Sequence, residues 1–112
     1  MAQFQTQLHG DVEALVGYLD QQILHGSVSA NIEDGSDQRL GDARMVVRVY
    51  ERYSAFGGNR VSLGISILAV GGELAVTAVS AGGSQAMFFK INTVGEKTFL
   101  GKAVEALQSF PG

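Results

Sequence analysis

An α+β fold is predicted for this sequence, with a curved antiparallel sheet of five to six strands and two helices on one face. Three observations predict it. Apolar residues follow a helical period near the two ends of the chain. Between these helices the apolar residues alternate with a period of two, as in half-buried strands. Short glycine-rich segments separate the strands and favour antiparallel pairing, so the predicted order is β-α-β-β-β-β-β-α.

The first predicted helix follows a short strand over residues 2–8. Asp11 is placed to cap its first turn, and the pair His25-Gly26 is placed to end it. The apolar residues between them are spaced at i, i+3, i+4, i+7 and i+11, so they share one face of the helix. These residues are Val12, Leu15, Val16, Leu19 and Ile23.

The middle of the chain predicts four strands joined by turns. The strands are expected over residues 27–33, 43–53, 60–68 and 73–81. The segments between them are expected as turns or loops at 34–37, 56–59 and 71–72. Alternation is clearest over residues 60–68, where one face carries Val61, Leu63, Ile65 and Ile67.

The end of the chain predicts one more hairpin and a second helix. Gly82-Gly83 is typical of a tight hairpin turn, and a short strand with Met87, Phe89 and Ile91 follows it. Residues 93–96 match a capping box, which marks the start of a helix. The expected apolar stripe of this helix is Phe99, Leu100, Ala103, Leu107 and Phe110.

Length and composition limit the class of protein. We expect one α+β domain over residues 1–112. Only 17% of the residues are charged, which is below the roughly 25% of an average domain. A surface so poor in charge indicates that part of it is covered, and a second copy of the chain is the simplest cover. We therefore expect a homodimer.

Other features exclude several classes of function. The chain has no cysteine, so disulfides, thiolate catalysis and zinc–thiolate sites are excluded. No signal peptide and no apolar run of about 18 residues is found, so we expect a cytoplasmic protein without a membrane partner. The net charge of −3 argues against nucleic acid as a partner. The two histidines, His9 and His25, flank the first helix about 24 Å apart, so no metal or cofactor is expected.

An arginine stripe is the main candidate binding feature. Arg44, Arg48 and Arg52 recur every four residues on one face of the strand over 43–53, with Tyr50 among them. If the other face, which carries Met45, Val47 and Val49, meets the helices, the arginine stripe lies on the open face of the sheet. Arg60 begins the next strand, and we expect it close to Arg52 if residues 56–59 close a hairpin.

The arginine stripe has three interpretations. It could bind an anionic small molecule or an acidic protein partner, since guanidinium groups bind carboxylate and phosphate in a forked geometry. It could instead form ordinary cross-strand pairs with glutamates. It could also pair with the acidic residues 33–42 of a second subunit.

Two smaller features of the sequence are also candidate sites. Glu51 and Tyr53 fall on the apolar face of the same strand, and a carboxylate on a buried face often marks a site. A β-bulge there would instead turn Glu51 to solvent. The segment 82–85 (GGSQ) could present backbone N–H groups to an anion, but a simple hairpin turn is favoured.

Three runs of the chain resemble an uncharacterised family of small bacterial proteins. They are residues 26–30 (GSVSA), 47–54 (VRVYERYS) and 82–93 (GGSQAMFFKINT). The resemblance spans nearly the whole chain and implies a bacterial origin, but it brings no known activity. The element order also resembles TATA-binding-protein-like and helix-grip domains, which include small lipid- and polyketide-binding domains. Because no motif of these families is present, no functional residue carries over.

The leading functional hypothesis is a non-enzymatic binding or interaction domain that forms a homodimer. Sheet positions with small side chains could pack flat against a second sheet; they include Ser62, Gly64, Ser66, Ala75, Thr77 and Ala81. The first alternative is a carrier that holds a small apolar or anionic molecule between sheet and helices. Its lining would be Met45, Val47, Leu63, Ile65, Met87, Phe89, Phe99 and Leu107. The second alternative is an enzyme that uses Glu51, Tyr53 and Arg48.

Overall fold

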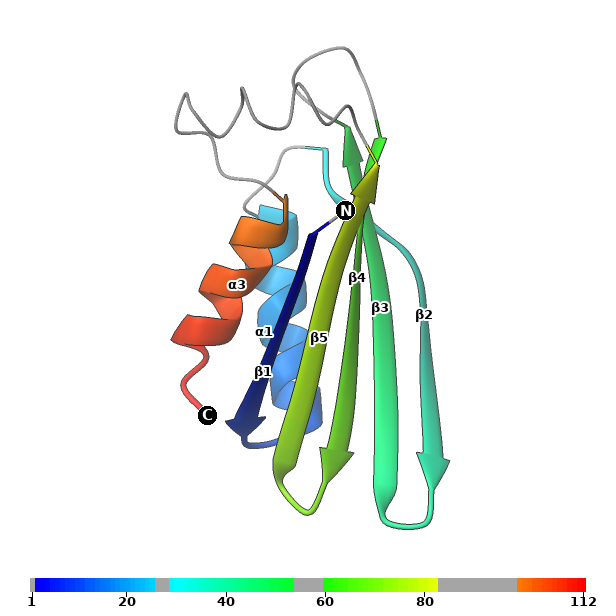
Figure 1. Cartoon of the computed structure of the whole chain (residues 1–112), viewed down its shortest axis with the longest axis vertical. Helices are drawn as coiled ribbons and strands as arrows, with labels where there is room; N and C mark the ends of the chain where they lie inside the picture. Colours follow the sequence, from blue (N-terminus) through cyan, green and yellow to red (C-terminus); the bar gives the residue numbers. More distant parts are fainter. Residues whose placement is uncertain (1, 26–28, 54–59, 83–98) are drawn as a thin grey trace.

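The computed structural model describes residues 2–25, 29–53, 60–82 and 99–112. Within these ranges the chain forms five strands and two helices (Figure 1). In chain order they are β1 (Ala2–His9), α1 (Val12–His25), β2 (Asn31–Leu40), β3 (Ala43–Tyr53), β4 (Arg60–Val70), β5 (Glu73–Gly82) and α3 (Phe99–Ser109).

The strands form a single open sheet in the order β1-β5-β4-β3-β2, and every neighbouring pair is antiparallel. β4 is therefore the central strand, and β1 and β2 are the two edges. The hairpins β2–β3, β3–β4 and β4–β5 place sequential strands side by side, as short connections favour. The predicted α+β fold with an antiparallel sheet and two helices is confirmed.

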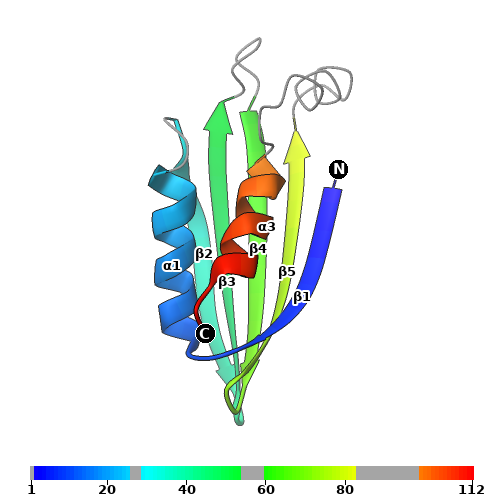
Figure 2. The same ribbon diagram turned by 90° about the vertical axis from the view of Figure 1, so that its left-hand side faces the viewer.

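Both helices lie on the same face of the sheet (Figure 2). α3 packs against β5, β1 and β4, and α1 packs against α3. α1 approaches the strands less closely than α3 does, and it lies over the β2 and β3 side of the sheet. No described element covers the opposite side of the sheet, which we call the open face (Figure 1).

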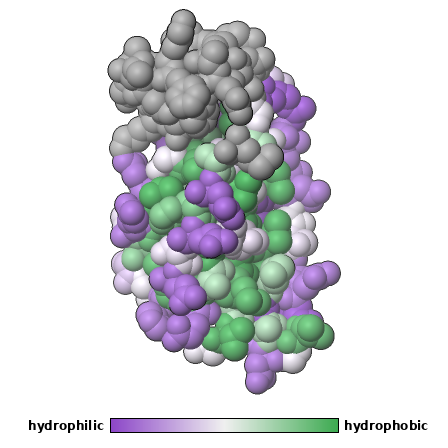
Figure 3. Space-filling model, viewed as in Figure 1, coloured by the Kyte–Doolittle hydropathy of each residue, from purple (hydrophilic) through white to green (hydrophobic). Residues whose placement is uncertain are grey.

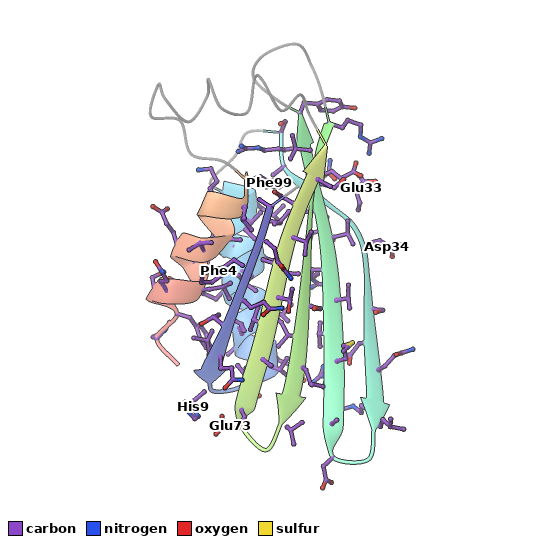
Figure 4. The ribbon with its side chains drawn as sticks, in the orientation of Figure 1. Phe4, His9, Glu33, Asp34, Glu73 and Phe99 are labelled. Atoms are coloured by element: carbon purple, nitrogen blue, oxygen red, sulfur yellow. The ribbon has the colours of Figure 1, made fainter. Side chains whose placement is uncertain are left out.

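The hydrophobic core lies between the sheet and the two helices. From α1 it contains Val12, Leu15, Leu19 and Ile23, and from α3 it contains Phe99, Ala103, Ala106 and Leu107. Alternate residues of β3, β4 and β5 complete it, and the largest of these are Tyr50, Leu63, Ile65, Ile67 and Leu74. Phe4 of the edge strand β1 packs against this core from the side of β1 (Figure 4). The apolar stripes predicted for both helices are thus the faces that they bury.

The start of α1 is capped as its sequence predicts. The Ala14 backbone N–H donates a hydrogen bond of 3.0 Å to Asp11 Oδ2. This bond satisfies one of the four N–H groups that the first turn of a helix leaves without a partner. The helix ends at His25, and the predicted stop at Gly26 lies outside the described residues.

The turn predicted at residues 34–37 is wrong, because these residues lie inside β2. The chain reverses at Gly41-Asp42 instead, with Leu40 and Ala43 as the closing pair. Gly41 has a φ of 59°, as the first central residue of a two-residue type II′ hairpin turn requires. As an edge strand with every side chain exposed, β2 needs no apolar alternation. Its backbone bonds to β3 hold it in the sheet.

The hairpin between β4 and β5 turns at Gly71-Gly72, as predicted. Their φ values of 57° and 87° suit a type I′ turn, which only glycine adopts readily at both positions. Several other predicted features lie outside the described residues: residues 26–28, the turn at 56–59, the Gly83–Gln85 segment, the strand with Met87, Phe89 and Ile91, and the capping box at 93–96.

Candidate functional site

The arginine stripe of β3 lies under the helices, and the expectation that it occupies the open face is wrong. Arg44, Arg48 and Arg52 alternate along β3 with Met45, Val47 and Val49, which instead lie on the open face. The two residues between the arginines, Val46 and Tyr50, are 6% and 0% exposed. Tyr50 pairs across the sheet with Leu63, a core residue of β4.

The face of β3 that lies under the helices is the less apolar of the two, because it carries the three arginines, so hydrophobic alternation predicts the wrong orientation. The face of β3 that packs under the helices is the one whose arginines can pair with carboxylates of α1. Arginine can bury its aliphatic stem while its guanidinium reaches a partner, and α1 supplies carboxylates at Glu13 and Asp20. The carboxylates of α1 thus favour packing of this helix over the arginine-bearing face of β3.

Asp20 of α1 binds two residues of the arginine stripe. Its carboxylate accepts two hydrogen bonds from Arg48, of 3.2 Å from Nε and 2.9 Å from one terminal nitrogen. Asp20 Oδ1 also accepts a hydrogen bond of 2.5 Å from the Tyr50 hydroxyl. The forked Arg48–Asp20 contact is the strong geometry for such pairs, and it ties the middle of α1 to the middle of β3.

Burial and charge shift the titration of this cluster. Burial raises the pKa of the Tyr50 hydroxyl well above its usual 10, and its hydrogen bond to Asp20 raises it further. The hydrogen bonds that Arg48 donates to Asp20 likewise raise the pKa of the Arg48 guanidinium. Tyr50 is therefore neutral in the folded state across the physiological range, and it acts as a hydrogen-bond donor to a carboxylate.

Arg44 forms a second ion-pair cluster nearer the hairpin end of β3. It donates two hydrogen bonds to Asp37 of β2, of 2.9 and 2.7 Å, and one of 3.1 Å to Glu13 of α1. The bonds to Asp37 and Glu13 raise the pKa of Arg44. The Arg44 guanidinium in turn lowers the pKa of Asp37. The acidic segment thus pairs with the arginine stripe within one chain, where a pairing between subunits was one of the expectations.

A groove of about 570 Å³ runs between α1 and the strands β2 and β3, with these two ion-pair clusters along it. Its walls between the clusters are small or apolar, formed by Val16, Gly17, Gly35 and Val46. The groove carries three carboxylates (Glu13, Asp20 and Asp37) and two guanidiniums (Arg44 and Arg48). Both guanidiniums are held by carboxylates, so an anionic ligand would have to displace one of them.

The third arginine of the stripe contacts an aromatic ring. The Arg52 guanidinium carbon lies 4.8 Å from the centre of the Phe99 ring, at the start of α3. A guanidinium over a ring face at this distance is a cation–π contact. The described parts of the stripe therefore connect β3 to both helices.

The remaining predicted site residues lie on the open face. Glu51 forms an ion pair with Arg60 of β4, and its other oxygen is 3.3 Å from the Ser62 hydroxyl. Arg60 also lies 3.7 Å from Glu33, the residue at the irregularity of β2. Tyr53 is 56% exposed. Because Arg48 lies on the other side of β3 from Glu51 and Tyr53, these three residues do not share a cleft.

The residues predicted to line the cavity of a carrier do not all lie on the same side of the sheet. Met45 and Val47 lie on the open face, away from the helices. Leu63, Ile65, Phe99 and Leu107 are at most 1% exposed within the packed core. Met87 and Phe89 lie outside the described residues.

The open face is a sheet surface that no described element covers. Its centre on β3, β4 and β5 holds eleven apolar, small or hydroxyl side chains and no charged one. They are Ala43, Met45, Val47, Val49, Gly64, Ser66, Leu68, Val70, Ala75, Thr77 and Val79. All the small-residue positions expected to pack against a second sheet lie on this face, and four of them are in this centre.

The two edge strands frame this centre with polar residues. The rim on β1 is Gln3, Gln5 and Gln7, and the rim on β2 is Asp34, Ser36 and Gln38. Figure 4 shows Asp34 pointing away from the helices, and it shows His9 of β1 beside Glu73 of β5. His9 Nδ1 lies 3.2 Å from a Glu73 carboxylate oxygen at the hairpin end.

Large apolar side chains gather at the hairpin end of the open face. We call the group of Leu40, Met45, Leu68 and Val70 the hairpin-end patch. Leu40 is 85% exposed and the other three are about 40% exposed. The space-filling view shows hydrophobic surface at this end of the molecule (Figure 3). The opposite end of the open face carries the charged residues Glu51 and Arg60.

The sequence reasoning missed the residues on α1. Asp20 and Glu13 receive the stripe's hydrogen bonds, yet neither was a candidate. A signal for them exists: Glu13, Gly17 and Asp20 follow the helical period one step beside the buried stripe. Acids at such boundary positions can reach an arginine on a neighbouring strand.

Neither a candidate metal-binding group nor a candidate membrane-spanning helix occurs in the described ranges. No group of three or more histidine, aspartate or glutamate residues there could hold a metal ion. No helix among the described elements is long and apolar enough to cross a membrane.

Two helices on one face of an open five-stranded antiparallel sheet define a two-layer α+β domain, and no described element covers the other face of the sheet. The chain belongs to a family of unknown function, DUF6054, whose model matches residues 1–111. No curated protein matches the sequence. The resemblance to an uncharacterised family is therefore confirmed, and the family brings no activity with it.

Proposed function

We propose that this chain is a non-enzymatic interaction domain that uses the open face of its sheet as the contact surface. The observation that carries the proposal is the uncharged centre of that face, which consists of eleven residues on three strands and is framed by polar edges. Protein interfaces have the same composition, with charge depleted at the centre and polar residues at the rim. Bacterial origin and a cytoplasmic location stay predictions from the sequence.

The groove beneath α1 supports a structural role. Each of its arginines donates at least two hydrogen bonds to carboxylates of the same chain. These contacts hold α1 over β2 and β3, and they keep the sheet rigid behind the open face. A rigid sheet loses little conformational entropy when it binds a partner.

Site-specific photo-crosslinking tests the proposal without requiring a known partner. A photo-crosslinking amino acid is placed at Leu68, on the open face, in protein expressed in its host. The matched control carries it at Gln22, an exposed position of α1. We expect crosslinks to protein from Leu68, and we expect Ser66→Glu in the same chain to abolish them. Crosslinks from Gln22 alone, or Leu68 crosslinks that persist with Ser66→Glu, would overturn the proposal.

A further inference from the structure

We infer that the partner of the open face is a second copy of this chain, packed sheet against sheet about a two-fold axis that runs along β4. This inference rests on the proposed function and names the partner of that surface. Three observations carry it: the size of the face, the distribution of apolar side chains along the strands, and the distribution of charge across them.

The size of the open face suits a dimer of sheets. Nine residues along each strand and five strands across give about 30 Å by about 24 Å, or roughly 700 Å². A stable interface buries about 800 Å² on each partner. Only a flat partner could cover the whole face at once. A second sheet of the same twist is such a partner, because stacked sheets pack about 10 Å apart with their strands nearly aligned.

The apolar distribution along the strands fixes the direction of the axis. The hairpin-end patch lies at one end of the open face, and the Glu51–Arg60 ion pair lies at the other. A two-fold axis along β4 places Leu68 and Val70 opposite their own copies and Met45 opposite Ala75 of the second copy, so apolar groups meet one another. A two-fold axis perpendicular to the strands through Ser66 would instead place Leu68 opposite Gly64 and Val70 opposite Ser62, and the two hairpin-end patches would lie at opposite ends of the interface.

The charge distribution across the strands leads to the same axis. With the axis along β4, the edge strand β2 of one copy faces β1 of the other. Asp34 then lies over the uncharged Gln3 rim, and Ser36 lies over Gln5. With the perpendicular axis, β2 would face β2 of the second copy, so the edge that carries Glu33 and Asp34 would lie along the same acidic edge of its partner. Like charges on facing edges disfavour that arrangement.

The central strand supplies the residue nearest the axis. Ser66 lies near the middle of β4, on the open face, and pairs with Val47 on one side and Thr77 on the other. Its small side chain, like that of Gly64, lets two sheets approach closely. An axis along β4 places Ser66 opposite Ser66 of the second copy.

Sedimentation velocity on the purified full chain tests this inference. We expect wild type to be a dimer at about 10 µM, and we expect Ser66→Glu to weaken the dimer at least about 100-fold. Ser66→Lys does the same. Gln22→Glu adds the same charge on the exposed side of α1 and leaves the dimer unchanged.

Mixing the two charged variants separates a lost interface from a lost fold. Because Ser66 meets its own copy, an equal mixture of Ser66→Glu and Ser66→Lys forms a heterodimer, although each alone is monomeric. A mixture that stays monomeric overturns the inference, and so does a wild-type chain that is monomeric at about 100 µM. If wild type is monomeric while Leu68 still crosslinks to a different protein in cells, the second copy is excluded and the proposed function stands.

Discussion

Asp20 and Tyr50 share a hydrogen bond of 2.5 Å that joins the middle of α1 to the middle of β3. The Tyr50 side chain has no exposed surface, and Asp20 is its acceptor. The same carboxylate binds Arg48 through two hydrogen bonds. One helical acid therefore binds two polar side chains of the arginine stripe, Arg48 and Tyr50.

Replacing Asp20 is expected to destabilise the fold. In Asp20→Asn the side chain that accepts the forked hydrogen bonds of Arg48 is no longer charged. The buried Tyr50 hydroxyl must then share a weaker acceptor with Arg48. We expect a loss of about 2 kcal/mol in the free energy of unfolding. Urea denaturation followed by circular dichroism measures it. Glu13→Gln is the matched control, because Glu13 is largely exposed and its pair with Arg44 should contribute less than about 1 kcal/mol. Equal losses in the two variants would contradict the role given to Asp20.

Stability should fall at alkaline pH because of Tyr50. An unfolded tyrosine ionises near pH 10, whereas folded Tyr50 keeps its proton to a higher pH because its pKa is raised. The stabilisation from its raised pKa is therefore complete below pH 10 and is lost as the pH rises above it. Unfolding free energies at pH 8 and at pH 10.5 measure the effect.

Two phenylalanine variants isolate that pH effect. Tyr50→Phe should show a smaller fall in stability between the two pH values, although it is less stable at both. Tyr53→Phe should follow wild type, because Tyr53 is 56% exposed. The account of Tyr50 is wrong if Tyr50→Phe and wild type lose the same stability over this interval.

Two glycine-to-alanine variants should change stability in opposite directions. Gly71 has a φ of 57°, so Gly71→Ala strains the β4–β5 turn and costs about 1 kcal/mol. Gly17 lies within α1, and a Cβ there meets nothing within 4 Å. Gly17→Ala should therefore stabilise the fold by about 0.5 to 1 kcal/mol. Thermal unfolding of both variants measures the two signs, and a stabilising Gly71→Ala would contradict the turn geometry.

The sequence predicts the helices and the central strands well, because their apolar periods are strong. Leu15, Leu19 and Ile23 on α1 and Leu63, Ile65 and Ile67 on β4 bury the faces that the alternation indicates. The sequence does not predict most of β2, because an exposed edge strand is held by backbone pairing and needs no apolar alternation. Its residues 34–37 have the composition of a loop, yet they pair with β3.

The candidate site is harder to predict, since its arrangement depends on contacts between distant segments. The arginine stripe is visible in the sequence, but its orientation is predicted wrongly, because Met45, Val47 and Val49 make the other face of β3 the more apolar one. The carboxylates of Asp20 and Glu13 decide the orientation, and they lie 28 and 31 residues from Arg48 and Arg44. No local pattern reports such a pairing.

Crosslinking between cysteines on the two edge strands tests the sheet-on-sheet dimer most directly. The chain has no natural cysteine, so each introduced thiol is unique. Gln5 of β1 and Ser36 of β2 lie at opposite ends of the row that crosses the sheet through Val47, Ser66 and Thr77. With the axis along β4, Gln5 lies about 10 Å from Ser36 of the second copy and about 22 Å from Gln5 of that copy.

The measurement mixes Gln5→Cys with Ser36→Cys and adds a short bismaleimide. The predicted result is an efficient crosslink in the mixture and little in either variant alone. Efficient crosslinking of Gln5→Cys to itself, or no crosslink in the mixture, would contradict the dimer.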